Sequence, residues 1–356
     1  MAPSSLPRRL VALLAGTALT AGGLALATAP PAGAAPGQGP TAIVSLGDSA
    51  ISGEGAGAYE PGTDFGLNYC HRSANALIKV ATIPVQAKLN ISCSGAESSD
   101  VRINGTTHFT EPSQADQLRA IAANYDIKLI VLQIGANDDP EFTSSVLSCV
   151  QAWANPFGSG CASSLRPAWP GRVAAMAPKA EASVNDVRTV MREAGYADSS
   201  YQFVLQSYAS PFTENMNAIT HAFQGCPLRL SDARFARTEA VPQLSAALRG
   251  VAARTGVRFL DLARATEGRE ACNKSVSSSN WWQNPLKIDA DELLQSPDPI
   301  NVVRQTFHPN ARGHAQLGRC LTEFYAAAGR EGACLRGADG NLHAVAGVTT
   351  ATASRS

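Results

Sequence analysis

Short apolar runs alternate with longer amphipathic segments along most of this chain. Five of the runs have the length and the β-branched content of buried strands, and they lie at residues 43–46, 88–93, 127–134, 201–208 and 257–262. Helices are predicted between and after them, at residues 74–86, 113–125, 172–195, 237–255 and 309–328. Strands that alternate with helices pair in parallel. The pattern therefore predicts an α/β fold, a three-layer sandwich with a parallel sheet of about five strands.

Four longer segments lack a clear period. Residues 52–68 are rich in glycine, and we expect them to form an ordered loop beside the ends of the strands. Residues 140–171 are interpreted as a long insertion. Residues 263–307 are irregular and contain Trp281-Trp282, which either pack in the core or line a pocket. The polar residues 341–356 are predicted to be a disordered tail.

The first 34 residues have the features of a secretory signal peptide. The Arg8-Arg9 pair precedes an Ala/Leu-rich run at 10–29, and Ala32-Gly33-Ala34 forms a small-residue cleavage site. The run is long enough to span a bilayer, so a membrane anchor is the alternative. The arginine pair also suits twin-arginine export, which leaves the route, Sec or Tat, open. We expect residues 1–34 to be removed and a single domain at 35–340 to be secreted to the extracellular space.

Charge and cysteine content narrow the class of protein. Lys+Arg and Asp+Glu balance at 29 each, which argues against a nucleic-acid groove or a strongly acidic partner. All 8 cysteines follow the predicted signal, and an even number in an exported chain indicates disulfides. No C-x-x-C pair is present, so a zinc site is not expected. Among the 105 possible pairings, the spacing favours pairs in sequence order, Cys70–Cys93, Cys149–Cys161, Cys226–Cys272 and Cys320–Cys334.

Three successive strands end in groups suited to nucleophilic catalysis. The first ends at Gly47-Asp48-Ser49, the second at Gly95 and the third at Gly135-Ala136-Asn137-Asp138. Parallel strands bring their carboxyl ends to one edge of a sheet, where His308 could join them. A serine hydroxyl needs a base, and a tetrahedral oxyanion needs hydrogen-bond donors such as backbone N–H groups and the Asn137 amide. The simpler alternative is that Asp48-Ser49 only caps the next helix.

His308 is the best candidate for the base among the 6 histidines. It precedes the last predicted helix, and its ordinary pKa suits proton transfer near neutral pH. His71 follows a cysteine and could also line the site. The others have simpler interpretations, a solvated position for His108 and His343, a segment without catalytic signals for His221, and a packed or capping position for His314.

These motifs, in this order, resemble the four sequence blocks of the SGNH (GDSL) hydrolase family, of the secreted bacterial esterase and lipase type. The resemblance covers about residues 43–328 and implies a flavodoxin-like sheet and no cofactor or metal. It implies that Ser49 is the nucleophile and His308 the base. It also implies that Ser49, Gly95 and Asn137 form the oxyanion hole.

Two positions depart from the family pattern. Ala50 stands where the family usually has leucine, and Gln305 stands where an aspartate usually orients the histidine. The ring could be oriented by the main-chain carbonyl of Gln305, by its side-chain oxygen, or by a more distant carboxylate of Asp289, Asp291 or Asp298. Some members of the family use a main-chain carbonyl, and on that resemblance we favour a Ser–His dyad.

The resemblance implies a secreted serine carboxylic-ester hydrolase, an esterase or lipase, that works through an acyl-enzyme. A carbohydrate O-acetyl esterase or a thioesterase would share this machinery. A non-catalytic carbohydrate- or lipid-binding module is the alternative from another class, and the joint presence of Ser49, Asn137 and His308 disfavours it. The chain has no G-x-S-x-G motif, which disfavours an ordinary α/β-hydrolase. We expect a small-molecule or lipid ester as substrate, no nucleic acid, no stable membrane insertion and a monomer.

Overall fold

The structure of the chain, a computed structural model, describes residues 38–288 and 303–347. The predicted signal peptide lies outside the described residues, as do the three carboxylates considered for orienting the histidine, Asp289, Asp291 and Asp298. Within the described ranges, no helix combines the length and the apolar character needed to cross a membrane.

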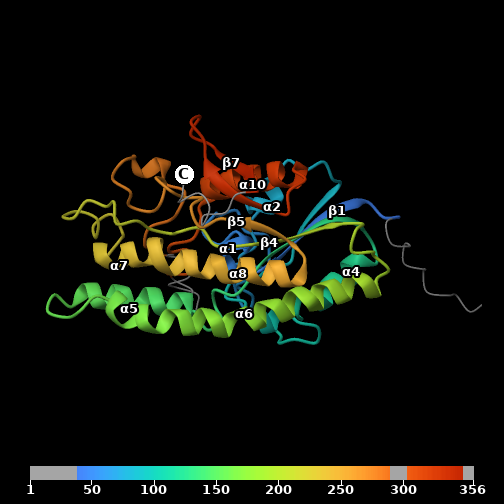
Figure 1. The fold of residues 1–356 in the computed structure, drawn as a ribbon, viewed down its shortest axis with the longest axis horizontal. Helices are drawn as coiled ribbons and strands as arrows, with labels where there is room; N and C mark the ends of the chain where they lie inside the picture. Colours follow the sequence, from blue (N-terminus) through green and yellow to red (C-terminus); the bar gives the residue numbers. More distant parts are fainter. Residues whose placement is uncertain (1–37, 289–302, 348–356) are drawn as a thin grey trace, which may run out of the picture. The chain divides into compact units, whose positions relative to one another are not determined.

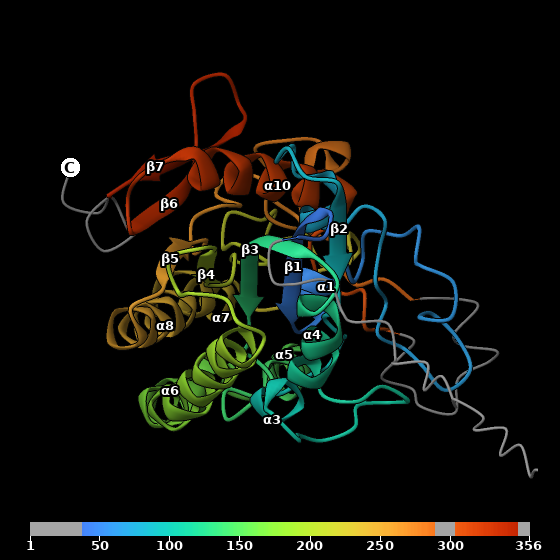
Figure 2. The ribbon, with the colours of Figure 1, turned by 90° about the vertical axis from the view of Figure 1, so that its right-hand side faces the viewer.

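A seven-stranded sheet forms the centre of the fold, in the order β2-β1-β3-β4-β5-β6-β7. Neighbouring strands pair in parallel, except that β7 is antiparallel to β6. Figure 2 shows β1 and β3 in the middle, with helices on both sides. The strands are β1 Thr41–Gly47, β2 Ala87–Asn90, β3 Asp126–Gln133, β4 Gln202–Gln206, β5 Arg258–Asp261, β6 Glu331–Arg336 and β7 Leu342–Ala346. The predicted α/β fold with a parallel sheet is confirmed, but the sheet has seven strands where about five were expected.

The additional strands come from the end of the chain. β6 and β7 form a hairpin in which Ala333 pairs with Val345, and Asp339-Gly340 lies in the connecting turn. The prediction of a disordered tail from 341 is therefore wrong for Leu342–Ala346. The apolar run of β6 is too short to be recognised alone. It forms a strand because β5 offers it a parallel partner and β7 covers its other edge.

Helices cover both faces of the sheet and divide its side chains between two cores. Helices α2 (Leu77–Val80) and α10 (Ala311–Ala326) pack on one face, and α4 (Gln114–Ala122), α6 (Ala162–Glu193) and α8 (Val241–Thr255) on the other (Figure 2). Successive side chains of a strand point to opposite faces. Ile43 and Leu129 accordingly join the core of α10, and Val44 and Ile130 join the core of α6. The shorter helical segments are α1 Ser49–Ser52, α3 Ser98–Val101, α7 Leu230–Phe235, the π-helix η1 Ala236–Ala240 and the 3-10 helix η2 Ser278–Asn280.

The predicted insertion at 140–171 is helical instead. It contains α5, Phe142–Ala154, and the beginning of α6, which starts at Ala162 rather than at the predicted residue 172. Prolines 167, 170 and 178 lie inside α6, where proline ordinarily kinks or breaks a helix. The buried residues Leu165, Trp169, Val173 and Met176 recur at helical spacing along this part of α6. Burial of that stripe outweighs the cost of the prolines, and Figure 1 shows the resulting pair of long helices, α6 and α8.

Four disulfides join the cysteines in sequence order, and the predicted pairing is confirmed. They are Cys70–Cys93, Cys149–Cys161, Cys226–Cys272 and Cys320–Cys334. The first ties the long loop after α1 to the end of β2. The last ties α10 to β6, which anchors the terminal hairpin to the helix that covers it.

Candidate active site

Ser49 lies where β1 ends and a one-turn helix begins. Gly47 has a φ of 131°, and a Cβ there would lie 1.9 Å from the carbonyl oxygen of Gln133, so only glycine fits at this position. Asp48 is the N-cap of α1, and its Oδ1 accepts the Ala50 N–H at 3.0 Å. Capping is therefore the role of Asp48. The same turn leaves the Ser49 side chain at the carboxyl edge of the sheet, with 8% of its surface exposed.

His308 reaches the Ser49 hydroxyl from the segment before α10. Its Nε2 lies 2.7 Å from Ser49 Oγ, and its Nδ1 lies 3.1 Å from the carbonyl oxygen of Thr306. A carbonyl oxygen only accepts hydrogen bonds, so Nδ1 carries the ring proton and Nε2 accepts from the serine. This is the tautomer that a serine nucleophile requires of its base.

The acceptor at Nδ1 is a main-chain carbonyl, as in the favoured dyad, but it belongs to Thr306 and is one residue away from Gln305. The side-chain oxygen of Gln305 instead accepts a hydrogen bond from Lys287 Nζ at 2.6 Å. Its carbonyl oxygen lies 3.4 Å from the backbone nitrogen of His308 and so helps to shape the turn. A backbone acceptor depends on the local turn and not on a side chain. This explains how an uncharged residue can occupy position 305.

Burial is the largest influence on the pKa of the His308 ring, and it lowers this pKa. The negative charge of Glu54 and hydrogen bonds to the backbone of Thr306 and Arg304 raise it, the Arg304 guanidinium lowers it, and the net effect is a lowering. A lowered pKa keeps the imidazole neutral near neutral pH. The neutral ring is the form that can take the proton from Ser49.

Three hydrogen-bond donors accompany the serine. Ser49, Gly95, Asn137 and His308 line the same pocket, so the structure brings together the four residues predicted from the sequence. Within the described residues, the backbone N–H groups of Ser49 and Gly95 donate to no other protein group. The Asn137 amide donates one of its two hydrogens to the Ala96 carbonyl at 3.0 Å, which fixes its orientation. This arrangement suits the stabilisation of an oxyanion.

Replacing Asn137 by alanine is expected to lower kcat by about 10²–10³ with a smaller change in KM. The reason is that the amide would stabilise charge that develops only in the transition state. Steady-state kinetics on a p-nitrophenyl ester, together with a thermal melt, tests this. A change confined to KM would show instead that Asn137 binds the substrate without stabilising the transition state.

A partly buried tyrosine joins the serine turn to the asparagine turn, and no sequence motif indicated it. The Tyr208 hydroxyl donates to Asp48 Oδ2 and accepts the Ala136 N–H at 3.2 Å. Burial raises the pKa of Asp48 to about 7, although the hydrogen bonds from Tyr208 and the Ala50 N–H oppose the increase. Tyr208 follows β4 by two residues. This position at the carboxyl edge of the sheet was the available signal.

A largely apolar pocket opens beside Ser49 and His308. It lies between the edge of the sheet and helices α5 to α8. A second pocket lies on the Gly95 side and shares Ser49, Asn137 and His308 with the first. Trp281-Trp282, whose role the sequence left open, are buried in the two cores. The large apolar side chains of the first pocket include Phe142, Val146, Leu165, Trp169, Phe212, Phe235, Leu244 and Phe307.

The other histidines form hydrogen bonds away from the Ser49 hydroxyl. His71 is buried, and its Nδ1 lies 2.6 Å from Glu54 Oε2. His108 was expected to be solvated, but its Nε2 donates to the Ser94 carbonyl at 2.9 Å, beside Gly95. The remaining three are bonded to backbone carbonyls (His221), to the Leu77 N–H (His314), and to Asp339 and Glu323 (His343).

The site residues fall inside a recognised family of enzymes. A sequence profile of the GDSL-like Lipase/Acylhydrolase family matches residues 45–316. The chain belongs to this family. The predicted resemblance to SGNH (GDSL) hydrolases is thus confirmed, and the chain is a carboxylic ester hydrolase.

Two similar proteins match most of the length of this chain. Lipase 2 of Streptomyces coelicolor is 26% identical over 314 residues, which are 86% of this chain and 97% of that protein. The crystal structure of phospholipase A1 from Streptomyces albidoflavus NA297 matches with a TM-score of 0.53 and 23% identity, over 77% of this chain and 94% of that one. The structural likeness supports the assignment of the fold. In the described part of the hydrolase, no group of three or more His, Cys, Asp or Glu residues is placed to hold a metal ion.

Proposed function

We propose that Ser49 and His308 hydrolyse carboxylic esters of fatty acids as a catalytic dyad. The observation that carries this proposal is the 2.7 Å contact between Ser49 Oγ and His308 Nε2 at the mouth of a largely apolar pocket. The main-chain carbonyl of Thr306 holds the ring in the required tautomer. Gly95 and Asn137 supply further donors beside the nucleophile.

In the acylation step, Ser49 Oγ attacks the ester carbonyl carbon while His308 Nε2 takes the hydroxyl proton. The carbonyl oxygen becomes an oxyanion that accepts hydrogen bonds from the Ser49 and Gly95 N–H groups and from the Asn137 amide. The resulting imidazolium keeps its Nδ1–H bond to Thr306. It then gives the Nε2 proton to the alcohol oxygen as the bond from carbon to that oxygen breaks.

In the deacylation step, a water molecule replaces the alcohol. His308 takes a proton from this water, and the hydroxide attacks the acyl-enzyme carbonyl. The same three donors stabilise the second oxyanion. Collapse releases the carboxylic acid, and the proton returns to Ser49 Oγ, so the enzyme is regenerated without a cofactor.

The lining of the pocket supports an apolar acyl chain. Its wall is built largely from aromatic and aliphatic side chains of α5 to α8. An apolar chain that leaves water for such a wall gains about 0.8 kcal/mol per CH₂. The pocket thus favours a lipid-type ester over a carbohydrate acetate.

Secretion is part of the same proposal. The signal-like N-terminal sequence supports it, and four disulfides suit an oxidising compartment. A monomeric state remains a prediction from the sequence.

A chain-length series of p-nitrophenyl esters tests the substrate proposal. We expect kcat/KM to rise by up to about fourfold per added CH₂ until the pocket is filled. Ala236 lies on η1 and lines the pocket, so Ala236→Phe should move the optimum to shorter chains. Ala246→Phe, on the exposed side of α8, is the matched control and should leave the optimum unchanged. An optimum at acetate, or the same optimum in Ala236→Phe, would argue against acyl binding in this pocket.

A further inference from the structure

A buried glutamate lies behind the candidate active site and takes no part in the steps above. Glu54 is 0% exposed and follows Gly53, the C-cap of α1. Its Oε2 lies 2.6 Å from His71 Nδ1 and accepts the Ser94 hydroxyl at 2.7 Å. Its Oε1 accepts the Tyr59 hydroxyl at 3.2 Å. A fully buried carboxylate with three side-chain partners is costly to assemble, and its position beside a reactive site needs an explanation.

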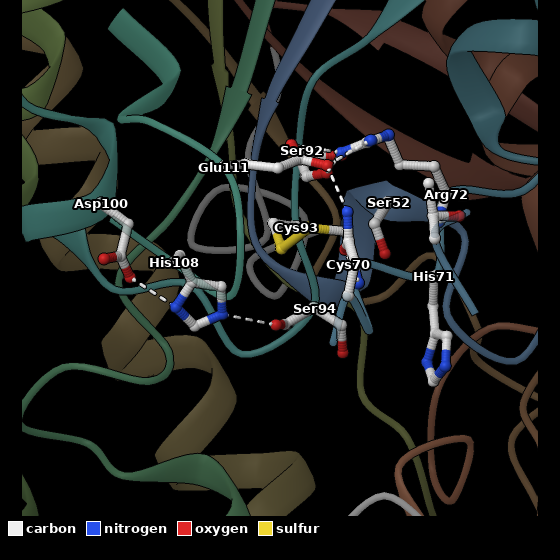
Figure 3. The surroundings of a disulfide bond; sticks show 12 residues. Ser52, Cys70, His71, Arg72, Ser92, Cys93, Ser94, Asp100, His108 and Glu111 are labelled. Carbon is white, nitrogen blue, oxygen red and sulfur yellow. Dashed lines mark hydrogen bonds and ion pairs between the residues drawn. A yellow bond between two sulfur atoms is a disulfide. The ribbon is translucent and has the colours of Figure 1, made fainter. Parts of the chain in front are cut away.

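The partners of Glu54 come from two segments that a disulfide joins. Figure 3 shows His71 next to Cys70 and Ser94 next to Cys93, on the two sides of the Cys70–Cys93 bond. The Ser94 N–H also donates to the Cys70 carbonyl at 3.0 Å. The carboxylate of Glu54 bridges these segments a second time through its bonds to His71 and Ser94. The backbone around Ser94 is therefore held by a covalent bond on one side and by a buried charge on the other.

Glu54 adjoins both parts of the proposed machinery. Ser94 directly precedes Gly95, which has a φ of 81° and lines the same pocket as Ser49. Gly55 directly follows Glu54, and a Cβ on Gly55 would lie 3.3 Å from the Cβ of His308. Glu54 thus bonds to the residue before the candidate oxyanion donor, and its neighbour Gly55 lies against the base.

The charge of Glu54 acts on His308. Burial raises the pKa of Glu54, but the charge and hydrogen bond of His71, the charge of His308 and the Ser94 hydroxyl lower it to about 2, so the carboxylate is ionised. His308 is faced by Glu54 from the loop after α1, by Arg304 from its own segment and by His314 from α10. Of these three, Glu54 is the one whose charge favours the imidazolium that forms during acylation.

We propose that Glu54 is a positioning residue for ester hydrolysis, which holds Ser94 so that the Gly95 N–H faces the oxyanion and which stabilises the protonated state of His308. The inference rests on the proposed function, because it assigns both effects to the Ser49 reaction. It differs from an orienting acid, since Thr306 already occupies Nδ1 of His308. Glu54 acts instead through the neighbouring backbone and through its charge.

The test compares Glu54→Gln with Glu111→Gln in the full-length hydrolase. Glu111 is a suitable control because it is a carboxylate bound to the same loop that does not contact Ser94 (Figure 3). It forms an ion pair with Arg72 at 2.5 Å and accepts a hydrogen bond from the Asn68 side chain. Asn68 precedes Cys70–His71 in the chain, and Arg72 follows it. Glu54→Gln keeps the size of the side chain and removes its charge. We expect kcat to fall by about tenfold to a hundredfold with little change in KM, because a displaced donor weakens transition-state stabilisation. Glu111→Gln should change the melting temperature and leave kcat within about threefold.

The pH profile separates positioning from a structural role. His308 must be neutral to act as base, so kcat/KM rises with pH through its pKa. Loss of the Glu54 charge lowers that pKa, and the acid limb should move to lower pH in Glu54→Gln and stay in place in Glu111→Gln. Ser94→Ala keeps the charge, so it should lower kcat without moving the limb. It also serves as the test if Glu54→Gln does not fold.

Labelling distinguishes failure of this inference from failure of the proposed function. A fluorophosphonate that does not label wild-type Ser49 would count against the proposed function itself. Normal labelling together with an unchanged kcat and an unchanged acid limb in Glu54→Gln would overturn the role of Glu54. A loss of kcat in Glu54→Gln that merely parallels its loss of melting temperature, with no movement of the limb, would also overturn it.

Discussion

Replacing Ser49 by alanine is expected to lower kcat for ester hydrolysis by about 10⁶, to the level of residual non-covalent catalysis. Ser49 Oγ is the atom that lies 2.7 Å from His308 Nε2, and alanine leaves no nucleophile there. The fold should persist, because Asp48 and not Ser49 caps α1. Steady-state rates on a p-nitrophenyl ester and a melting temperature within a few degrees of wild type would establish this.

Covalent labelling provides the control for Ser49. A fluorophosphonate should modify wild-type Ser49 and leave Ser49→Ala unmodified. Ser52, one turn further along, is fully buried and donates to the Ser49 carbonyl at 3.2 Å, so it should not react. Labelling at any serine other than Ser49 would refute the assignment.

The second large effect is expected at His308. His308→Ala removes the group that takes the serine proton, and kcat should fall by about as much as in Ser49→Ala. Residues that act as one unit are not additive, so the double variant should be no slower than either single variant. Single-turnover measurements of acyl-enzyme formation would show whether the loss lies in the chemical step.

Gln305→Ala is the matched control for His308. Its side chain bonds to Lys287, and the acceptor at Nδ1 is the Thr306 carbonyl, so we expect a loss of less than tenfold. Removing the orienting acid of a true triad costs about 10⁴ in kcat. A loss of that size in Gln305→Ala, with the fold intact, would contradict the dyad.

The proximity of the candidate site residues was easier to predict from the sequence than the bounds of the surrounding elements. Ser49, Gly95 and Asn137 follow three successive strands, and parallel strands place their carboxyl ends at one edge, so their proximity follows from the fold class. The acceptor for His308 could be predicted only as a type of group. Which carbonyl accepts the hydrogen bond from Nδ1 depends on the conformation of the turn between Arg304 and His308. The sequence pattern does not show whether that carbonyl belongs to residue 305 or to residue 306.

Tertiary contacts account for the elements that were missed. The beginning of α6 contains prolines 167 and 170, and only the stripe of Leu165, Trp169 and Val173 against the core makes a helix favourable there. The terminal hairpin is short and weakly apolar, and it forms because the sheet edge at β5 provides a partner. In both cases the deciding interaction lies far away in the sequence.

The polar pairs around the site were the least predictable feature. The contact between Tyr208 and Asp48 joins residues 160 positions apart, and that between Glu54 and His71 depends on the irregular loop between α1 and α2. Neither pair has a characteristic spacing. The only signal in the sequence was the position of one member of each pair. Tyr208 lies close to a strand end, and His71 follows a cysteine.

The order of the disulfides bears on how the protein is made. Each bond joins a cysteine to the next one along the chain, with separations of 12 to 46 residues. A polypeptide emerges from its N-terminus first, so Cys70 and Cys93 are both available before Cys149 appears. When disulfides form as fast as the chain emerges, a newly emerged cysteine finds only one other free thiol. That thiol belongs to its native partner. The correct bonds would then arise directly, without an enzyme that reshuffles wrong ones.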